Sequence, residues 1–82
     1  MPNEYSRLKI LLAEDHRVVA EGLERLLLEC FGSVEVVGEG QQLLDAVQAS
    51  SPDVIVADIS MPGVSGLEAL RSLRSAGNMT PF

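Results

Sequence analysis

Residues 53–66 read DVIVADISMPGVSG, and this stretch decides the fold. After the leading aspartate, the first part is apolar and mostly β-branched, which predicts a short buried strand. Strands that are apolar on both faces are typical of parallel sheets covered by helices above and below. Asp58 follows the strand directly, and the next loop contains Pro62 and Gly63, which favour a turn. The stretch therefore predicts a parallel strand with a carboxylate at its carboxyl end.

The rest of the chain repeats this alternation of strand and helix. Two further apolar runs predict strands, at residues 8–13 and 34–38. Apolar residues spaced three and four apart predict helices, at about residues 16–30, 41–49 and 66–75. Strand–helix units in this order predict an α/β layered fold with a parallel sheet and right-handed crossovers.

The helix ends carry signals of their own. Asp15 is the predicted N-cap of the first helix, because a short acceptor side chain can bind the free N–H groups there. Gly32 is predicted to lie just past its end, where the left-handed conformation is common. Cys30 falls on the apolar stripe of that helix, so we expect it in the core. Pro52 ends the second helix, because the residue before a proline avoids the α region.

Composition limits the class of function. The chain has 82 residues, of which 46% are hydrophobic, enough for one small domain with an aliphatic core. Its net charge of −6 argues against a nucleic-acid or anionic-membrane surface here, because phosphates attract clusters of lysine and arginine. The apolar runs are far shorter than the roughly 20 residues of a membrane span. One cysteine, with no secretory segment at the N-terminus, predicts a reducing cytoplasm.

Three carboxylates are expected to meet at the carboxyl edge of the sheet. Glu14 and Asp15 follow the first predicted strand, and Asp58 follows the third. In such sheets, functional groups gather in the crevice beyond the carboxyl ends of the strands. Carboxylates packed together favour a hard divalent cation such as Mg²⁺, and the backbone carbonyl of Ser60 could add an oxygen. Acidic residues at these positions also serve as helix caps and solubilising groups, and composition and spacing leave that interpretation open.

Two motifs resemble the receiver domain of two-component response regulators. One is the triplet Glu14-Asp15-His16 after the first strand, and the other is D-x-x-M-P-x-x-x-G, from Asp58 to Gly66. The resemblance covers nearly the whole chain and implies a flavodoxin-like fold with strand order 2-1-3-4-5. The phrases VVGEG and DVIVADISMPGVSGLEALRSLR look most like regulators whose receiver precedes a LuxR-type helix-turn-helix DNA-binding domain.

The resemblance implies a role for each matching acid. Asp58 would be the phosphoacceptor, whose carboxylate takes a phosphoryl group from a phosphohistidine of a sensor histidine kinase. Glu14, Asp15 and Asp58, with the Ser60 backbone carbonyl, would hold Mg²⁺, which offsets the repulsion between two anions. The chain would therefore be a signalling module and not an enzyme, within a parent protein that regulates transcription.

Residues near these acids receive simpler interpretations. Met61, Pro62 and Gly66 would shape the loop after the third strand and begin the third helix, which is also ordinary turn chemistry. His16, beside the acidic pair, is interpreted as an ordinary helix-start residue.

A typical receiver has five strands and five helices, and this chain supplies three of each. Residues 80–82 resemble the beginning of a fourth strand. The family's Ser/Thr after the fourth strand and Lys after the fifth are absent, so we expect residues 1–82 to be a partial, truncated receiver domain that cannot switch. An open third-strand edge and an uncovered sheet face predict a homo-oligomer. Any DNA contact would need a domain absent from this chain.

Two other functions stay open. A Mg²⁺-dependent aspartyl phosphotransferase or phosphatase could use the same nucleophile, but a second Asp two residues further on would favour it, and Ser60 stands there. The other alternative is an oligomerising fragment with a vestigial acidic site. Mg²⁺ titration would separate these functions, because a vestigial site gives no localised response.

Overall fold

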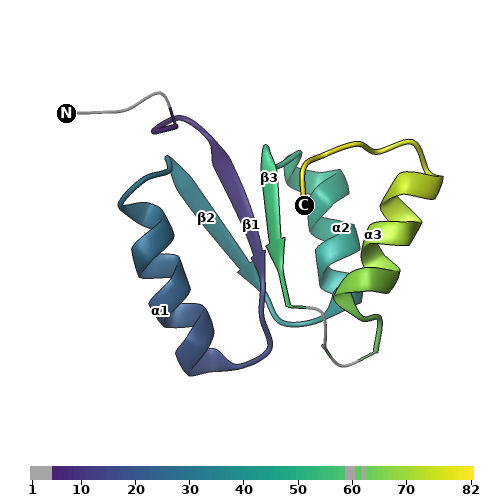
Figure 1. The fold of residues 1–82 in the computed structure, drawn as a ribbon, viewed down its shortest axis with the longest axis horizontal. Coiled ribbons are helices and arrows are strands. Elements are labelled where there is room, and N and C mark those ends of the chain that lie inside the picture. Colours follow the sequence, from purple (N-terminus) through teal and green to yellow (C-terminus); the bar gives the residue numbers. More distant parts are fainter. Residues whose placement is uncertain (1–4, 59–60, 62) are drawn as a thin grey trace.

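The computed structural model describes residues 5–58, 61 and 63–82. Its elements follow the predicted order of strands and helices. They are β1 (Lys9–Ala13), α1 (Arg17–Leu28), β2 (Ser33–Val37), α2 (Gly40–Ser50), β3 (Val54–Ala57) and α3 (Gly66–Ser75) (Figure 1). The predicted bounds of the third helix are confirmed, and the ends of the other elements lie within two residues of the prediction. Among the residues described, no helix is both long and apolar enough to cross a membrane.

The described strands form one parallel sheet in the order β2-β1-β3. β1 lies in the middle, with Ile10 paired to Val34 on one side and to Val54 on the other. α1 covers one face of this sheet, and α2 and α3 cover the other (Figure 1). This arrangement confirms the predicted α/β layers and the flavodoxin-like order of the first three strands.

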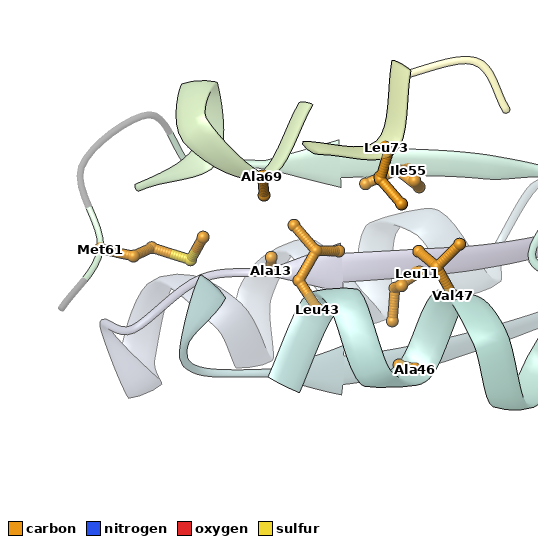
Figure 2. Packing of buried hydrophobic residues seen from close by; sticks show 9 residues of the cluster. All are labelled: Leu11, Ala13, Leu43, Ala46, Val47, Ile55, Met61, Ala69 and Leu73. Carbon is orange, nitrogen blue, oxygen red and sulfur yellow. The ribbon is translucent and has the colours of Figure 1, made fainter. Parts of the chain in front are cut away.

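β1 is the buried centre of the fold, because its two faces pack against different helices. Leu11 and Ala13 belong to the cluster on the α2 and α3 side, where Ile55 of β3 joins them. Figure 2 shows the side chains of this cluster, which are Leu11, Ala13, Leu43, Ala46, Val47, Ile55, Met61, Ala69 and Leu73. Ile10 and Leu12 alternate with the first two and are also buried, on the α1 side. Burial on both faces explains why the strand sequence is almost entirely apolar.

The first turn of α1 corrects one prediction. His16 is the N-cap residue, with extended backbone angles (φ −85°, ψ 109°), and the predicted cap Asp15 lies one position before it. The Asp15 carboxylate instead lies 3.2 Å from His16 Nδ1. The Asp15 side chain, which local sequence would assign to capping the helix, thus interacts with the His16 side chain instead.

The end of α1 corrects two more predictions. The helix ends at Leu28, so Cys30 lies past it and is exposed, where a core position was predicted. Gly32, predicted to follow the helix directly, lies further along, in the turn before β2. A Cβ atom on Gly32 would lie 2.5 Å from the Ser6 carbonyl oxygen. Close approach of the N-terminal segment, and not helix capping, therefore explains this glycine.

The C-terminal residues return to the sheet. The Ile55 N–H donates a hydrogen bond of 2.8 Å to the Pro81 carbonyl oxygen, and the chain end lies beside β3 (Figure 1). This contact occupies part of the outer edge of β3, which the sequence predicts to be open. Residues 80–82, whose sequence resembles the beginning of a fourth strand, thus lie next to β3.

Candidate functional site

The backbone places two of the predicted acids at one edge of the sheet. The Glu14 N–H donates to the Val37 carbonyl oxygen of β2 (3.0 Å), and the Asp58 N–H donates to the Ala13 carbonyl oxygen of β1 (2.9 Å). Sheet hydrogen bonding therefore continues one residue past the strands on both sides of β1. Glu14 and Asp58 are held at the carboxyl ends of neighbouring strands.

Four side chains converge at this edge. Glu14, Asp15, His16 and Asp58 each offer one ligand atom, and these atoms lie within 4.8 Å of one another. The structure thus brings together the three carboxylates that the sequence predicts to meet. His16 joins them, although the sequence-based interpretation made it an ordinary helix-start residue. Its position directly after the acidic pair is the one sequence signal that pointed to it.

His16 bridges the acidic pair. Its Nδ1 atom lies 2.8 Å from Glu14 Oε1 and 3.2 Å from Asp15 Oδ1. The His16 backbone N–H also donates to Glu14 Oε1, at 3.0 Å. The side chains of Glu14 and Asp15 are 10% and 26% exposed, against 68% for His16. The carboxylates therefore lie further inside the crevice than the imidazole.

Hydrogen bonding between Glu14 and His16 shifts the pKa of both groups. The backbone N–H of His16, followed by its imidazole, stabilises the carboxylate and lowers the pKa of Glu14 below its ordinary value. In return, the hydrogen bond to Glu14, with the charge of Asp15 adding to it, raises the pKa of His16. Each shift favours the charged form of its own group.

The donor set fits a hard divalent cation. Three carboxylates supply oxygen, the ligand that Mg²⁺ prefers, and their partial exposure leaves water access to the crevice. The N-cap of α1 is His16, so helix capping does not account for Asp15. Ser60, whose backbone carbonyl is a predicted ligand, lies outside the described residues.

The loop after β3 is anchored in the core by Met61 and leads into the capped N-terminus of α3. Met61 is buried at one end of the cluster that packs against α2 and α3 (Figure 2). Ser65 is the N-cap of α3, and its Oγ accepts a hydrogen bond from the Glu68 N–H at 3.2 Å. Gly66 is the first residue of that helix and is buried. These positions are compatible with the predicted loop-shaping roles of Met61 and Gly66, and Pro62 lies outside the described residues.

The start of α2 packs closely against the same loop. Gly40 is the first residue of α2, and a Cβ atom on it would overlap the Val64 carbonyl group. A glycine is therefore required for this approach. No local pattern in the sequence shows which distant segment lies against Gly40.

Comparison with known proteins identifies the family. The response regulator receiver domain matches residues 10–82. Response regulator MprA of Mycolicibacterium vanbaalenii is 40% identical over 74 residues, a region that makes up 90% of this chain and 32% of that protein. Response regulator MprA of Mycobacterium avium is 40% identical over 75 residues, which cover 92% of this chain and 33% of that protein. The chain thus spans about a third of the length of these curated relatives.

Solved structures share the fold. The Francisella response regulator 1452 receiver domain has a TM-score of 0.85 and 30% identity, over 92% of this chain and 62% of that one. A two-component response regulator of the LuxR family from an Aurantimonas species has a TM-score of 0.78 and 30% identity, over 87% of this chain and 52% of that one. Because the family match runs from residue 10 to residue 82 and the fold agrees with it, this chain belongs to the response regulator receiver domain family.

Proposed function

We propose that this chain is the phosphoacceptor receiver module of a two-component response regulator, in which Asp58 takes a phosphoryl group from a sensor histidine kinase. One observation carries the proposal: a ligand atom of Asp58 lies within 4.8 Å of those of Glu14 and Asp15. A carboxylate beside an acidic pair can accept a phosphoryl group and share a cation with that pair. Membership of the receiver family supports the same role.

The proposed transfer is a displacement at phosphorus. A carboxylate oxygen of Asp58 attacks the phosphorus of a phosphohistidine, the phosphorus–nitrogen bond breaks, and an acyl phosphate forms as the kinase histidine leaves. Both reacting groups are anionic, so positioning and charge compensation must lower the barrier. Mg²⁺, when bound, would supply that compensation, and Glu14, Asp15, Asp58 and the Ser60 backbone carbonyl would hold it.

The parent protein is proposed to regulate transcription in the cytoplasm. We infer that it contacts DNA through a LuxR-type domain outside these residues, which the VVGEG phrase and similarity to the Aurantimonas regulator support. Sequencing the parent open reading frame tests this inference. A downstream domain of another class would contradict it.

Taken alone, residues 1–82 are proposed to act as a partial receiver domain. They do not include the Ser/Thr and Lys that the family resemblance places after a fourth and a fifth strand. A Lys ammonium group forms strong charge-assisted hydrogen bonds with phosphoryl oxygens. Without it, we expect these residues to accept phosphoryl groups slowly and not to switch.

Intact-mass measurement tests the acceptor. The chain and its Asp58→Asn variant are incubated with acetyl phosphate and Mg²⁺. We expect slow addition of one phosphoryl group to the chain and none to Asp58→Asn. Asp53→Asn is the control, because the Asp53 carboxylate lies at the other end of the strands, where it accepts the Lys9 N–H at 2.8 Å. Addition to Asp58→Asn would exclude Asp58 as the acceptor, and fast complete addition to the chain would contradict the proposed need for Lys.

Two measurements separate this proposal from its alternatives. Release of inorganic phosphate over many turnovers would favour an aspartyl phosphatase or phosphotransferase. An oligomerising fragment with a vestigial site would show no localised NMR shifts at Glu14, Asp15 and Asp58 when Mg²⁺ is added.

A further inference from the structure

We propose that His16 is a nitrogen ligand of the cation site, so that the site binds transition ions such as Zn²⁺ and Ni²⁺ more tightly than Mg²⁺. The inference rests on the proposed cation site and adds a donor that the receiver resemblance does not assign. The position of one atom, His16 Nδ1, carries it.

His16 Nδ1 is hydrogen-bonded to Glu14 Oε1, and its distances from the acidic pair also suit neighbouring ligands of one ion. Around a six-coordinate ion with bonds of about 2.1 Å, adjacent ligand atoms are about 3 Å apart and opposite ones about 4.2 Å. Nδ1 lies 2.8 Å from Glu14 Oε1 and 3.2 Å from Asp15 Oδ1, close to the adjacent distance. Glu14, Asp15, His16 and Asp58 each offer a ligand atom, and these atoms lie within 4.8 Å of one another, slightly more than the distance between opposite ligands. Small side-chain adjustments would therefore let one ion reach all four residues.

The Glu14 carboxylate would stay in place if the His16 imidazole rotated toward a bound metal ion. The His16 backbone N–H donates to Glu14 Oε1 at 3.0 Å, in addition to the contact that Nδ1 makes with the same oxygen. When Nδ1 coordinates an ion, it gives up that contact, but the backbone hydrogen bond still orients the carboxylate. The His16 side chain is largely exposed, so this adjustment disturbs no core packing.

The chemistry of the donor atoms decides which ions respond to His16. Mg²⁺ takes oxygen ligands and keeps several waters, so the carboxylates alone can hold it. Imidazole nitrogen suits Zn²⁺ and Ni²⁺, which it binds as the neutral ring with its hydrogen on the other nitrogen. His16 therefore adds a ligand for Zn²⁺, whereas Mg²⁺ gains no bond from the imidazole nitrogen.

The test uses the fact that His16 is the one histidine in the sequence. A chain without a histidine tag carries Cys30→Ser, so that the exposed thiol cannot bind Zn²⁺. The chain is labelled uniformly with nitrogen-15 and titrated with Zn²⁺ or Mg²⁺, while NMR follows His16 Nδ1 and the residues Glu14 and Asp58. We expect Zn²⁺ to shift the Nδ1 resonance strongly and Mg²⁺ to leave it without a coordination shift.

Calorimetry on matched variants gives a second readout. His16→Asn is expected to weaken Zn²⁺ binding by at least about tenfold, since even outer-shell partners of a metal contribute about 10–100-fold. Its Mg²⁺ affinity is expected not to show this loss, because Mg²⁺ does not use the imidazole nitrogen. Asp45→Asn removes an exposed acid on α2 and is expected to change neither affinity.

The remaining outcomes distinguish a wrong role for His16 from a wrong cation site. Zn²⁺ shifts at Glu14 and Asp58 with an unmoved Nδ1 would overturn the role of His16 and leave the proposed cation site intact. Undiminished Zn²⁺ binding by His16 in Asp58→Asn would also overturn it, because the ion would then bind outside the site. If neither cation shifts the carboxylates, the proposed cation site is itself wrong.

Discussion

The Asp58 backbone N–H donates a 2.9 Å hydrogen bond to the carbonyl oxygen of Ala13, the last residue of β1. This bond ties the proposed phosphoacceptor to the strand that leads into Glu14 and Asp15. It extends the parallel ladder between β1 and β3, so the sheet backbone sets the spacing of the acids. Changes that displace this framework are expected to alter the site even when they lie outside it.

Gly40→Ala is expected to destabilise the fold and disturb the acidic site. The added Cβ would overlap the Val64 carbonyl group, so the loop that follows Asp58 must move. We expect the free energy of unfolding to fall by about 1–3 kcal/mol, the usual cost of overpacking. Urea unfolding measures that loss, and NMR shifts near Asp58 report the displacement.

Gly22→Ala is the matched control for this change. Gly22 lies exposed within α1, and nothing lies within 4 Å of an added Cβ among the residues described. Alanine is the better helix former, so this variant is expected to gain about 0.5–1 kcal/mol. Equal stability of Gly40→Ala and the parent chain would contradict the close approach of α2 to the loop.

Leu43→Ala is expected to cost far more than Leu26→Ala. Leu43 is 0% exposed in the cluster of Figure 2, whereas Leu26 on α1 is 61% exposed. A cavity in the core costs about 2–5 kcal/mol, and an exposed change about 0.5 kcal/mol or less. Thermal unfolding followed by circular dichroism compares the two variants. Similar losses would show that Leu26 is buried in solution by another surface.

The pair of Glu14 and His16 predicts two opposite pH dependences. The pKa of Glu14 is lowered in the fold, so its contribution to stability is present above the ordinary value of 4.5 and is lost as the pH falls through the lowered pKa. The pKa of His16 is raised, so its contribution is present below the ordinary value of 6.5 and is lost as the pH rises through the raised pKa. Urea unfolding, measured from below pH 4.5 to above pH 6.5, follows both losses of stability.

Glu14→Gln tests the interaction between Glu14 and His16. It is expected to bring the pKa of His16 back toward 6.5, because the hydrogen bond to Glu14 is the main cause of the shift. NMR titration of the ring follows the change. Glu21→Gln is the control, since Glu21 faces Arg17 at 3.7 Å. An unchanged pKa of His16 in Glu14→Gln would show that the pair is not formed in solution.

Exposed apolar side chains on the α1 side of the sheet predict self-association. Val56 is paired with Leu12 and so lies on the face that α1 covers, and Val19 and Leu26 of α1 are exposed as well. Apolar groups gathered on one surface favour an interface. We expect sedimentation to show a dimer and Val56→Lys to shift it toward the monomer. Val18→Lys, on the outward side of α1, is expected to have no such effect, and a compact monomer of the parent at high concentration would contradict the prediction.

Local sequence by itself determined the type and order of the elements. Apolar periodicity and chain breakers act within a few residues, and these signals need no knowledge of distant segments. α3 shows this best, because both of its predicted ends are confirmed. Its N-cap Ser65 and the following Gly77, with φ of +85°, are both local devices. The placement of Glu14, Asp15 and Asp58 after strands followed from the same local signals.

Tertiary structure alone decided how several side chains are used. Asp15 has the chemistry of an N-cap, but it lies against His16 at the acidic edge. Cys30 has the spacing of a core residue, but the helix ends before it. No local pattern marks Gly40, but the approach of Val64 requires a glycine there. These outcomes depend on which distant segments meet and on where hydrogen bonding ends a helix, and the spacing of residues along one segment contains neither.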